Sequence, residues 1–273
     1  MNGPIAQAAA LVCYGNGFLA GLRTSFFPAN STCRYCDRIN FVETPASAAG
    51  RNGETDIAGS PDAWFEYLKR NGASGLTLAR GARNQPEISD RMSAGFVGGG
   101  EAWTIRAMSR DGRSRSWQSR WEVWNKDAPE QGLWRVTYGC VGESKDRSRA
   151  AADLPAIRDE LAASLRDAHE FSRRNSCSGF TERFASAIAA LAGDAGAGRV
   201  CHKDLAPAGV LSDEALRMLD ACQHAWVFGG MGSWNDLGFD GEEARTYERV
   251  SERLFRTVNR GIAAAASSSC RAE

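Results

Sequence analysis

The feature that most constrains the fold is a change in the spacing of apolar residues halfway along the chain. Up to residue 141 apolar side chains mostly recur at every second position, and after residue 152 they recur at every third or fourth. Successive side chains alternate across a strand, whereas a helix repeats about every 3.6 residues. The change therefore predicts a sheet followed by helices, with the polar stretch 142–152 between them. We expect residues 1–145 to be mostly antiparallel β with short helices, and residues 146–273 to be helical and able to pack on the sheet as one domain.

The clearest strands are predicted between residues 103 and 141. Trp103 and Ile105 alternate with polar neighbours, and Asp111-Gly112 offers the residue types that a tight hairpin turn needs. Two more alternating segments follow, so the three form an antiparallel meander. The meander strands are 103–108, 115–124 and 134–140; shorter apolar segments at 39–43, 75–79 and 93–97 suggest further strands. Together they predict a sheet of about five strands.

Four helices are predicted in the C-terminal part, because apolar stripes of helical period lie between residues that begin and end helices. Asp153 and Ser212 are expected N-caps, Gly193 is an expected C-terminal stop, and Asp240 with Glu243 has the spacing of a capping box. The expected helices start near residues 153, 178, 212 and 240, and shorter ones are expected at 5–11 and 61–70. The predicted fold class is therefore α+β.

Charge and hydropathy exclude some partners. The 273 residues contain 33 Lys+Arg and 33 Asp+Glu, so no net positive field attracts nucleic acid or an anionic membrane. The longest apolar runs fall short of the ~20 residues that a bilayer requires, and no basic residue precedes Arg23, so the cationic flank of a secretory signal is missing. We expect a soluble cytoplasmic protein with no membrane or nucleic-acid partner; its abundant arginine and alanine are typical of GC-rich bacterial genomes.

A metal site is a minor alternative at the only closely spaced cysteine pair, Cys33 and Cys36. Two thiolates with this spacing can face one Zn²⁺, but a structural site needs two more ligands. No second pair has this spacing, and the histidine-bearing clusters at 201–202 and 222–224 are far away in sequence. We therefore expect packed thiols, no metal and no cofactor, and no disulfides in a reducing compartment.

The polar side of the meander is the first candidate site. If the tryptophans at 103, 117, 121 and 134 face the core, then Arg106, Arg120 and Arg135 emerge together on the opposite face with Trp124 beside them. A row of guanidinium groups next to an aromatic ring can bind a phosphate, a carboxylate or single-stranded nucleic acid. The alternative is an ordinary solvated face, because antiparallel sheets commonly leave one face in water.

The loop at residues 229–238 is the second candidate site. Its glycines allow close backbone approach, Trp234 and Asn235 can contact a ligand, and Asp236 can act as a base. The alternative is structural: Trp234 fills a gap between helices while its polar neighbours satisfy helix ends. Of the three histidines, His202 lies in an irregular segment and is the one most free to act in catalysis.

Two functions from different classes remain open. No GxSxG elbow, HExxH helix, P-loop or dinucleotide-binding motif occurs in the chain. We expect a non-catalytic binding or interaction module for a small molecule or a protein, acting through the arginine face or the 229–238 loop. The alternative is an enzyme for a small anionic substrate at the junction of sheet and helices, where the three arginines hold the anion and Asp236 or His202 performs acid/base work.

Overall fold

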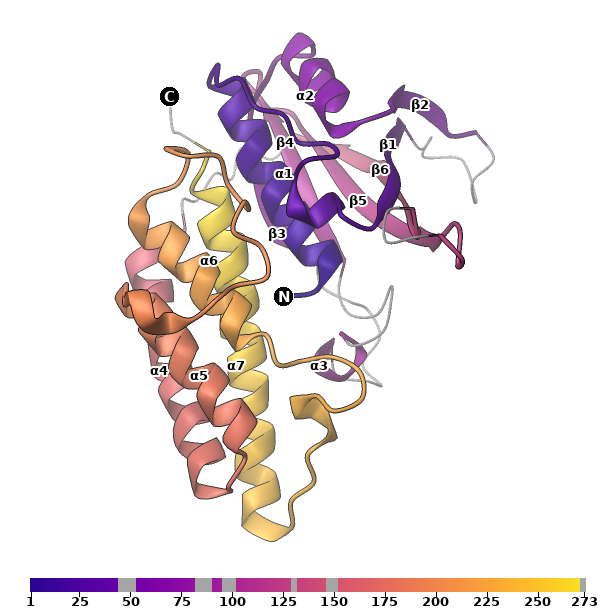
Figure 1. The fold of residues 1–273 in the computed structure, drawn as a ribbon. Helices are drawn as coiled ribbons and strands as arrows, with labels where there is room; N and C mark the ends of the chain where they lie inside the picture. The colour runs from indigo at the N-terminus through magenta and orange to yellow at the C-terminus, as the bar shows by residue number, and fades with distance from the viewer. Residues whose placement is uncertain (44–52, 82–89, 95–101, 129–131, 146–151, 271–273) are drawn as a thin grey trace.

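The computed structural model of the protein describes residues 1–43, 53–81, 90–94, 102–128, 132–145 and 152–270 (Figure 1). The described residues form a mixed α+β structure, in which a sheet from the N-terminal half is followed by a bundle of C-terminal helices. Six strands of the described residues make one sheet: β1 (Cys36–Glu43), β2 (Thr55–Ala58), β3 (Ala73–Arg80), β4 (Trp103–Ser109), β5 (Ser114–Val123) and β6 (Trp134–Ser144).

The strand order is β2-β1-β6-β5-β4-β3, and the meander of β4, β5 and β6 is confirmed. Gly112 takes a positive φ of 81° in the turn between β4 and β5, which explains the glycine there. Three details differ from the expectation. The sheet has six described strands rather than about five, because the short β2 was not expected, and β1 joins β6 in parallel, since strands that are distant in sequence need not reverse direction. Of the strand expected at 93–97, Ser93 belongs to a helix and residues 95–97 lie outside the described residues.

The helices agree with most of the local signals. They are α1 (Gly3–Leu19), α2 (Pro61–Arg70), α3 (Asp90–Ser93), α4 (Leu154–Arg174), α5 (Ser178–Ala192), α6 (Asp213–Ala225) and α7 (Gly241–Ser267), with 3-10 helices η1 (Ser31–Cys33), η2 (Ala195–Ala197) and η3 (Trp234–Asp236). Asp153 and Ser212 cap α4 and α6 through their side chains, and Gly193 ends α5 at φ 82°. The capping box expected at Asp240 is not formed, because Asp240 makes no side-chain cap hydrogen bond.

Helix α1 is longer than expected and continues through the glycines that suggested its end. A Cβ atom on Gly15 would lie 2.3 Å from a side-chain carbon of Leu76, so glycine lets α1 approach β3 closely. A Cβ atom on Gly17 would likewise lie 3.1 Å from a side-chain carbon of Val210. Here close packing, rather than a chain turn, accounts for the glycines.

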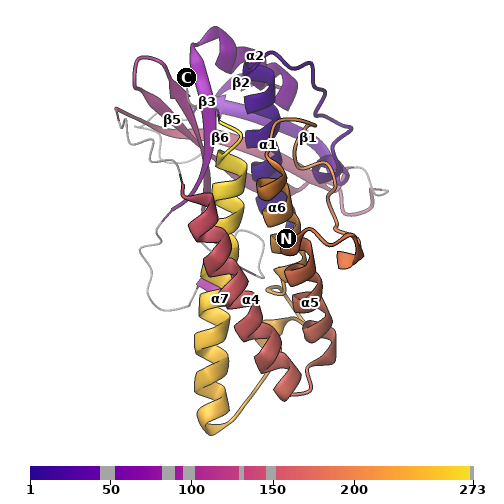
Figure 2. The same ribbon diagram turned by 90° about the vertical axis from the view of Figure 1, so that its left-hand side faces the viewer.

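One face of the sheet is covered by helices, and the other is the polar face of the meander. Helices α1 and α2 lie against the covered face, and α7 reaches β3 from the bundle of α4 to α7, which extends away from the sheet (Figures 1 and 2). An aromatic cluster fills this interface: Phe41, Trp64, Trp117 and Tyr138. Buried apolar residues of the sheet and of the bundle form one continuous cluster. No helix within the described residues combines the length and the apolar character that crossing a bilayer requires.

The outer edge of β3 is closed by side chains instead of another strand. Asn16 of α1 accepts a hydrogen bond from the Leu76 N–H at 2.6 Å and donates one to the Leu76 carbonyl at 2.9 Å. Ser267 of α7 likewise accepts from the Leu78 N–H at 2.9 Å and donates to its carbonyl at 3.3 Å. These contacts satisfy backbone groups that an edge strand would otherwise leave unpaired.

Candidate functional site

The three predicted arginines share the polar face of the sheet, but only two of them are neighbours. Arg120 pairs with Thr137, and Arg135 pairs with Glu122, so the two guanidinium groups lie diagonally across β5 and β6. Arg106 pairs with Ser116, four positions from Arg120 along β5. At about 3.3 Å per residue that separation is roughly 13 Å. The predicted row of three arginines therefore consists of two neighbours, Arg120 and Arg135, with Arg106 distant from both.

Carboxylates neutralise the two neighbouring arginines. Arg120 forms two hydrogen bonds with Glu54, one of them at 2.7 Å, and this pairing raises the pKa of Arg120. Arg135 donates to Asp37 at 3.1 Å, and its guanidinium group lies over the ring of Trp124. Both pairs reduce the positive potential that a phosphate or a nucleic acid would encounter.

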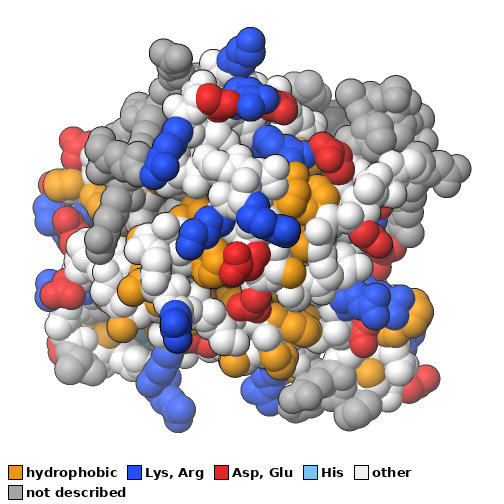
Figure 3. All heavy atoms as spheres, turned by 90° about the horizontal axis from the view of Figure 1, so that it is seen from above, with side chains coloured by type: hydrophobic (Ala, Val, Ile, Leu, Met, Phe, Trp, Pro, Cys, Tyr) orange, Lys and Arg blue, Asp and Glu red, His pale blue; other side chains and the backbone are white. Residues whose placement is uncertain are grey.

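Opposite charges are also interspersed elsewhere on the surface. On the face seen in Figure 3, basic and acidic side chains of the described residues lie among hydrophobic ones, and no area of one sign stands out.

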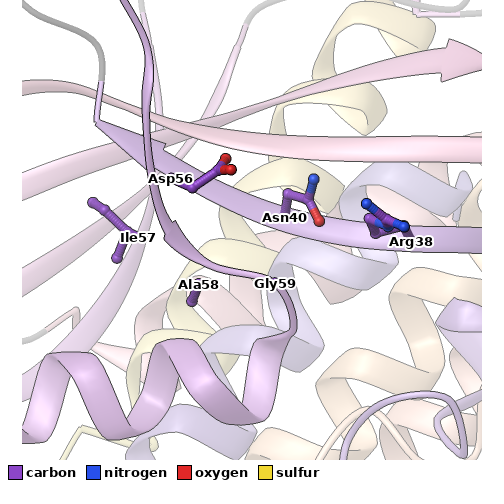
Figure 4. Close-up of a pocket in the computed structure, with 6 residues that line it drawn as sticks. All are labelled: Arg38, Asn40, Asp56, Ile57, Ala58 and Gly59. Atoms are coloured by element: carbon purple, nitrogen blue, oxygen red, sulfur yellow. The ribbon is translucent and has the colours of Figure 1, made fainter.

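A hollow of about 240 Å³ opens on the same polar face, between β1 and β2 (Figure 4). Residue pairing sets Arg38 beside Arg135, Asn40 beside Thr137, and Asp56 on β2 beside Val42, the next residue of that face. Figure 4 shows Arg38 and Asn40 on the same side of β1, with the Asp56 carboxylate reaching toward that side from β2 and Ile57 pointing away. The lining residues are Arg38, Asn40, Asp56, Ile57, Ala58 and Gly59.

An unsatisfied acceptor lies in this hollow. The Asn40 side-chain oxygen Oδ1 is buried and has no hydrogen-bond partner. Arg38 and Asp56 are exposed on either side of it, and Arg38 forms no ion pair with any described residue. A buried acceptor without a partner lowers the stability of the folded protein by about 1–3 kcal/mol. A ligand that donates a hydrogen bond to it would recover this free energy. The hollow thus presents a guanidinium group, a carboxamide and a carboxylate side by side.

Sequence reasoning missed the residues of this hollow. The sequence of β1 does indicate this face, because Arg38 and Asn40 alternate with the buried Ile39 and Phe41. The strand was expected to start only at Ile39, so Arg38 lay outside the expected strand. The contribution of Asp56 depends on β2, whose four residues carry no clear alternation.

His202 lies in a different place, with Ser31 of η1 and Asp204. The Ser31 hydroxyl donates to the Asp204 carboxylate, whose other oxygen accepts from the Ser31 N–H at 2.7 Å. His202 Nδ1 lies 2.8 Å from the same hydroxyl oxygen, so it acts as the N–H donor there and not as a base for Ser31. Burial lowers the pKa of His202, and Gln223 holds its backbone N–H and carbonyl. Asp204 thus holds the first N–H of η1, whose N-cap is Asn30, and His202 donates to the same Ser31 hydroxyl.

The three residues predicted in the 229–238 loop lie together in η3, where all are engaged within the protein. Trp234 has no exposed surface on which a ligand could stack, and its indole N–H donates to Ser251 at 2.7 Å. Asp236 and Ser233 form a capping box at the start of η3. Asn235 accepts from the guanidinium group of the buried Arg91 at 2.8 Å and donates to its carbonyl.

The two cysteines considered as metal ligands are buried beside α1. Burial raises the pKa of Cys33 to about 12 and that of Cys36 to about 11, which keeps both as thiols. The Cys36 sulfur accepts from Gln7 at 3.6 Å. Within the part of the chain that the structure describes, no group of three or more His, Cys, Asp or Glu side chains is placed to hold a metal ion.

The structure therefore brings together Arg120, Arg135 and Trp124 on the polar face, and Trp234, Asn235 and Asp236 in η3. It does not bring either group to His202, which lies on the side of η1 and α1, or to Arg106 at the other end of the face. No protein-family model, curated protein or solved structure matches this chain.

Proposed function

We propose that the protein is a non-catalytic binding module, and that it holds a small zwitterionic ligand in the hollow between β1 and β2. The observation that supports this proposal is the buried, unpartnered Asn40 oxygen between the Arg38 guanidinium group and the Asp56 carboxylate. A ligand with a carboxylate and an ammonium group, such as an amino acid, matches these charges. Its N–H groups supply the donor that Asn40 lacks.

The size of the hollow favours a small ligand. Its volume of about 240 Å³ corresponds to roughly eight waters at ~30 Å³ each. The backbone of the edge strand β2 forms one wall, so main-chain groups near Gly59 lie within reach of the same ligand. A compact molecule with several polar groups makes the best use of this space.

Catalysis on a small anion remains the alternative proposal, and the arrangement of charged groups supports it less. It requires the arginines and an acid/base group to converge on one point. Arg120 and Arg135 are held by Glu54 and Asp37, while His202 and Asp236 each serve a 3-10 helix elsewhere.

Thermal-shift measurements with three matched series test the proposal. The zwitterions glycine, β-alanine and γ-aminobutyrate are compared with acetate, propionate and butyrate, and with ethylamine and propylamine. A ligand at a concentration of 100 times its Kd raises the free energy of unfolding by about 2.7 kcal/mol. For a chain of this size that increase raises Tm by about 5–10 °C. We expect a zwitterion to stabilise the protein more than either single-charge series.

Variants locate the binding. Arg38→Gln and Asn40→Leu, which keeps the side-chain shape, should both remove the shift, and Arg106→Gln on the same face should leave it unchanged. Shifts that persist in Arg38→Gln and Asn40→Leu, or the absence of any shift in the wild type, contradict a small-ligand site in this hollow. A shift produced by anions alone and lost in Arg106→Gln would instead favour the anion-substrate alternative.

A further inference from the structure

A second hollow lies at the end of the helical bundle that points away from the sheet. It is bounded by the start of α5 and by the segment from Gly232 to Phe239, which includes most of the loop that the sequence analysis singled out (Figure 1). Its volume is about 620 Å³. Pockets that hold small organic molecules span about 300–1,000 Å³, so this one has a sufficient size.

Apolar side chains form one wall of this hollow and are fixed by the aromatic core of the bundle. Phe180 packs edge-on against Trp234 at 5.2 Å between ring centroids, and Phe239 packs edge-on against Phe171 at 5.1 Å. Leu237 lines the same wall. All three lining residues are only partly buried, so apolar surface remains exposed to the hollow. The buried Trp234 shapes this wall without reaching the ligand space itself.

The charge of the lining is positive. Arg183 of α5 lines the hollow, is exposed, and forms no hydrogen bond or ion pair with any described residue. No lining residue is acidic. Two carboxylates contact lining residues from outside the lining: Glu243 accepts from the side chain of Asn175 at 3.3 Å, and Asp236 accepts from the backbone N–H of Gly232 at 2.5 Å. Arg183 also lowers the pKa of His224, which burial already lowers, so its positive potential is felt by neighbouring groups.

We propose that this hollow binds an amphipathic organic anion, an aliphatic monocarboxylate, with its chain against Phe180, Leu237 and Phe239 and its carboxylate on Arg183. The apolar wall buries the chain, and the guanidinium group supplies charge-assisted hydrogen bonds to the carboxylate. This site is independent of the zwitterion site on the sheet, because it lies on other elements and recognises a different class of ligand.

Titration calorimetry with octanoate and with 1-octanol tests the proposal. We expect octanoate to bind with a stoichiometry of one, and 1-octanol of the same chain length to bind at least five-fold more weakly. Arg183→Gln should weaken octanoate binding by about five- to ten-fold, as expected for a charge-assisted contact that water partly screens. Arg166→Gln provides the matched control, because Arg166 is also exposed on a bundle helix but lies outside the hollow.

Blocking variants test the location without removing any contact of the core. A Cβ atom at Gly179 or Gly238 would meet no atom within 4 Å, and neither glycine has a positive φ. Gly179→Leu and Gly238→Leu should therefore fill the hollow and abolish octanoate binding, and Gly179→Leu should not lower Tm, because it replaces a glycine within a helix. Gly142→Leu, at another open position, should bind normally.

Three results would overturn the proposal. These are no octanoate binding by the wild type, equal affinity of the wild type and Arg183→Gln, or unchanged binding in both blocking variants. None of them affects the zwitterion site, which is measured with other ligands and other variants.

Discussion

Replacing Asn16 with alanine tests the most specific contact in the fold, the closure of the β3 edge by a side chain. Asn16 is 5% exposed, and its carboxamide serves both the N–H and the carbonyl of Leu76, which is fully buried. The variant leaves both backbone groups without partners. Each unpaired group lowers the free energy of unfolding by about 1–3 kcal/mol, so the two together lower it by about 2–6 kcal/mol. Alanine recovers about 0.5 kcal/mol of helix propensity in α1. We expect a net loss of roughly 2–5 kcal/mol.

Urea denaturation followed by tryptophan fluorescence measures this loss. The midpoint should fall while the slope m stays unchanged, because the surface exposed on unfolding hardly differs. Asn71→Ala is the matched control: its carboxamide donates to the Tyr67 carbonyl at 2.8 Å, but the contact is exposed. That variant should lose only about 0.5 kcal/mol, since water replaces the lost contact. Equal losses in the two variants would refute the argument.

Asn16→Asp separates the two hydrogen bonds. The carboxylate still accepts from the Leu76 N–H, but its second oxygen faces the Leu76 carbonyl without a proton. Burial raises the folded-state pKa of the new carboxyl above its unfolded value of about 3.9. The variant is then most destabilised above the folded-state pKa, and the penalty should shrink as pH falls toward 4. A penalty that does not depend on pH would show that the folded-state pKa of the new carboxyl is not raised, which contradicts a buried carboxylate facing the Leu76 carbonyl.

Three further outcomes are expected. Gly15→Ala should lower stability by about 1–3 kcal/mol in urea denaturation despite its better helix propensity, because the new methyl group would lie 2.3 Å from a β3 side chain; an unchanged midpoint would contradict close packing of α1. Burial lowers the folded-state pKa of His202, so its contribution to stability is complete above the unfolded pKa of about 6.5 and is lost as pH falls from that value through the lower folded-state pKa; His202→Gln should therefore flatten the stability profile between pH 7 and 5. A thiol reagent at pH 8 should label the exposed Cys201 quickly and the buried Cys33 and Cys36 only on unfolding, and Cys201→Ser should remove the fast phase.

The helices could be predicted because their ends are marked by local chemistry. Asp153 and Ser212 accept hydrogen bonds from the first turns that follow them, and Gly193 takes the left-handed conformation that ends α5. Helix α1 was underestimated for the opposite reason. Gly15 looks like a helix stop in sequence, but its role is set by Leu76, which lies 61 positions further along the chain.

The face of the sheet that carries the arginines was predictable, whereas the partners of these arginines were not. Alternation places Arg106, Arg120 and Arg135 on one face, because it depends only on the next residue along the strand. Their spacing depends on register, which put Arg106 four positions away along β5. Their neutralisation depends on Glu54 and Asp37, which come from segments far away in sequence.

The pairing of carboxylates decides which guanidinium groups can receive a ligand. Arg120 and Arg135 belong to ion pairs, so an added anion must compete with Glu54 and Asp37. Arg38 stands directly beside Arg135 in the parallel pairing of β1 with β6, but Asp37 is paired with Arg135, so Arg38 is the guanidinium group that a carboxylate can approach without competing with an ion pair. Asp56 limits this effect, because a ligand with negative charge alone would also be repelled from β2. For the proposed function we therefore expect a molecule with both charges to bind more tightly than a simple anion.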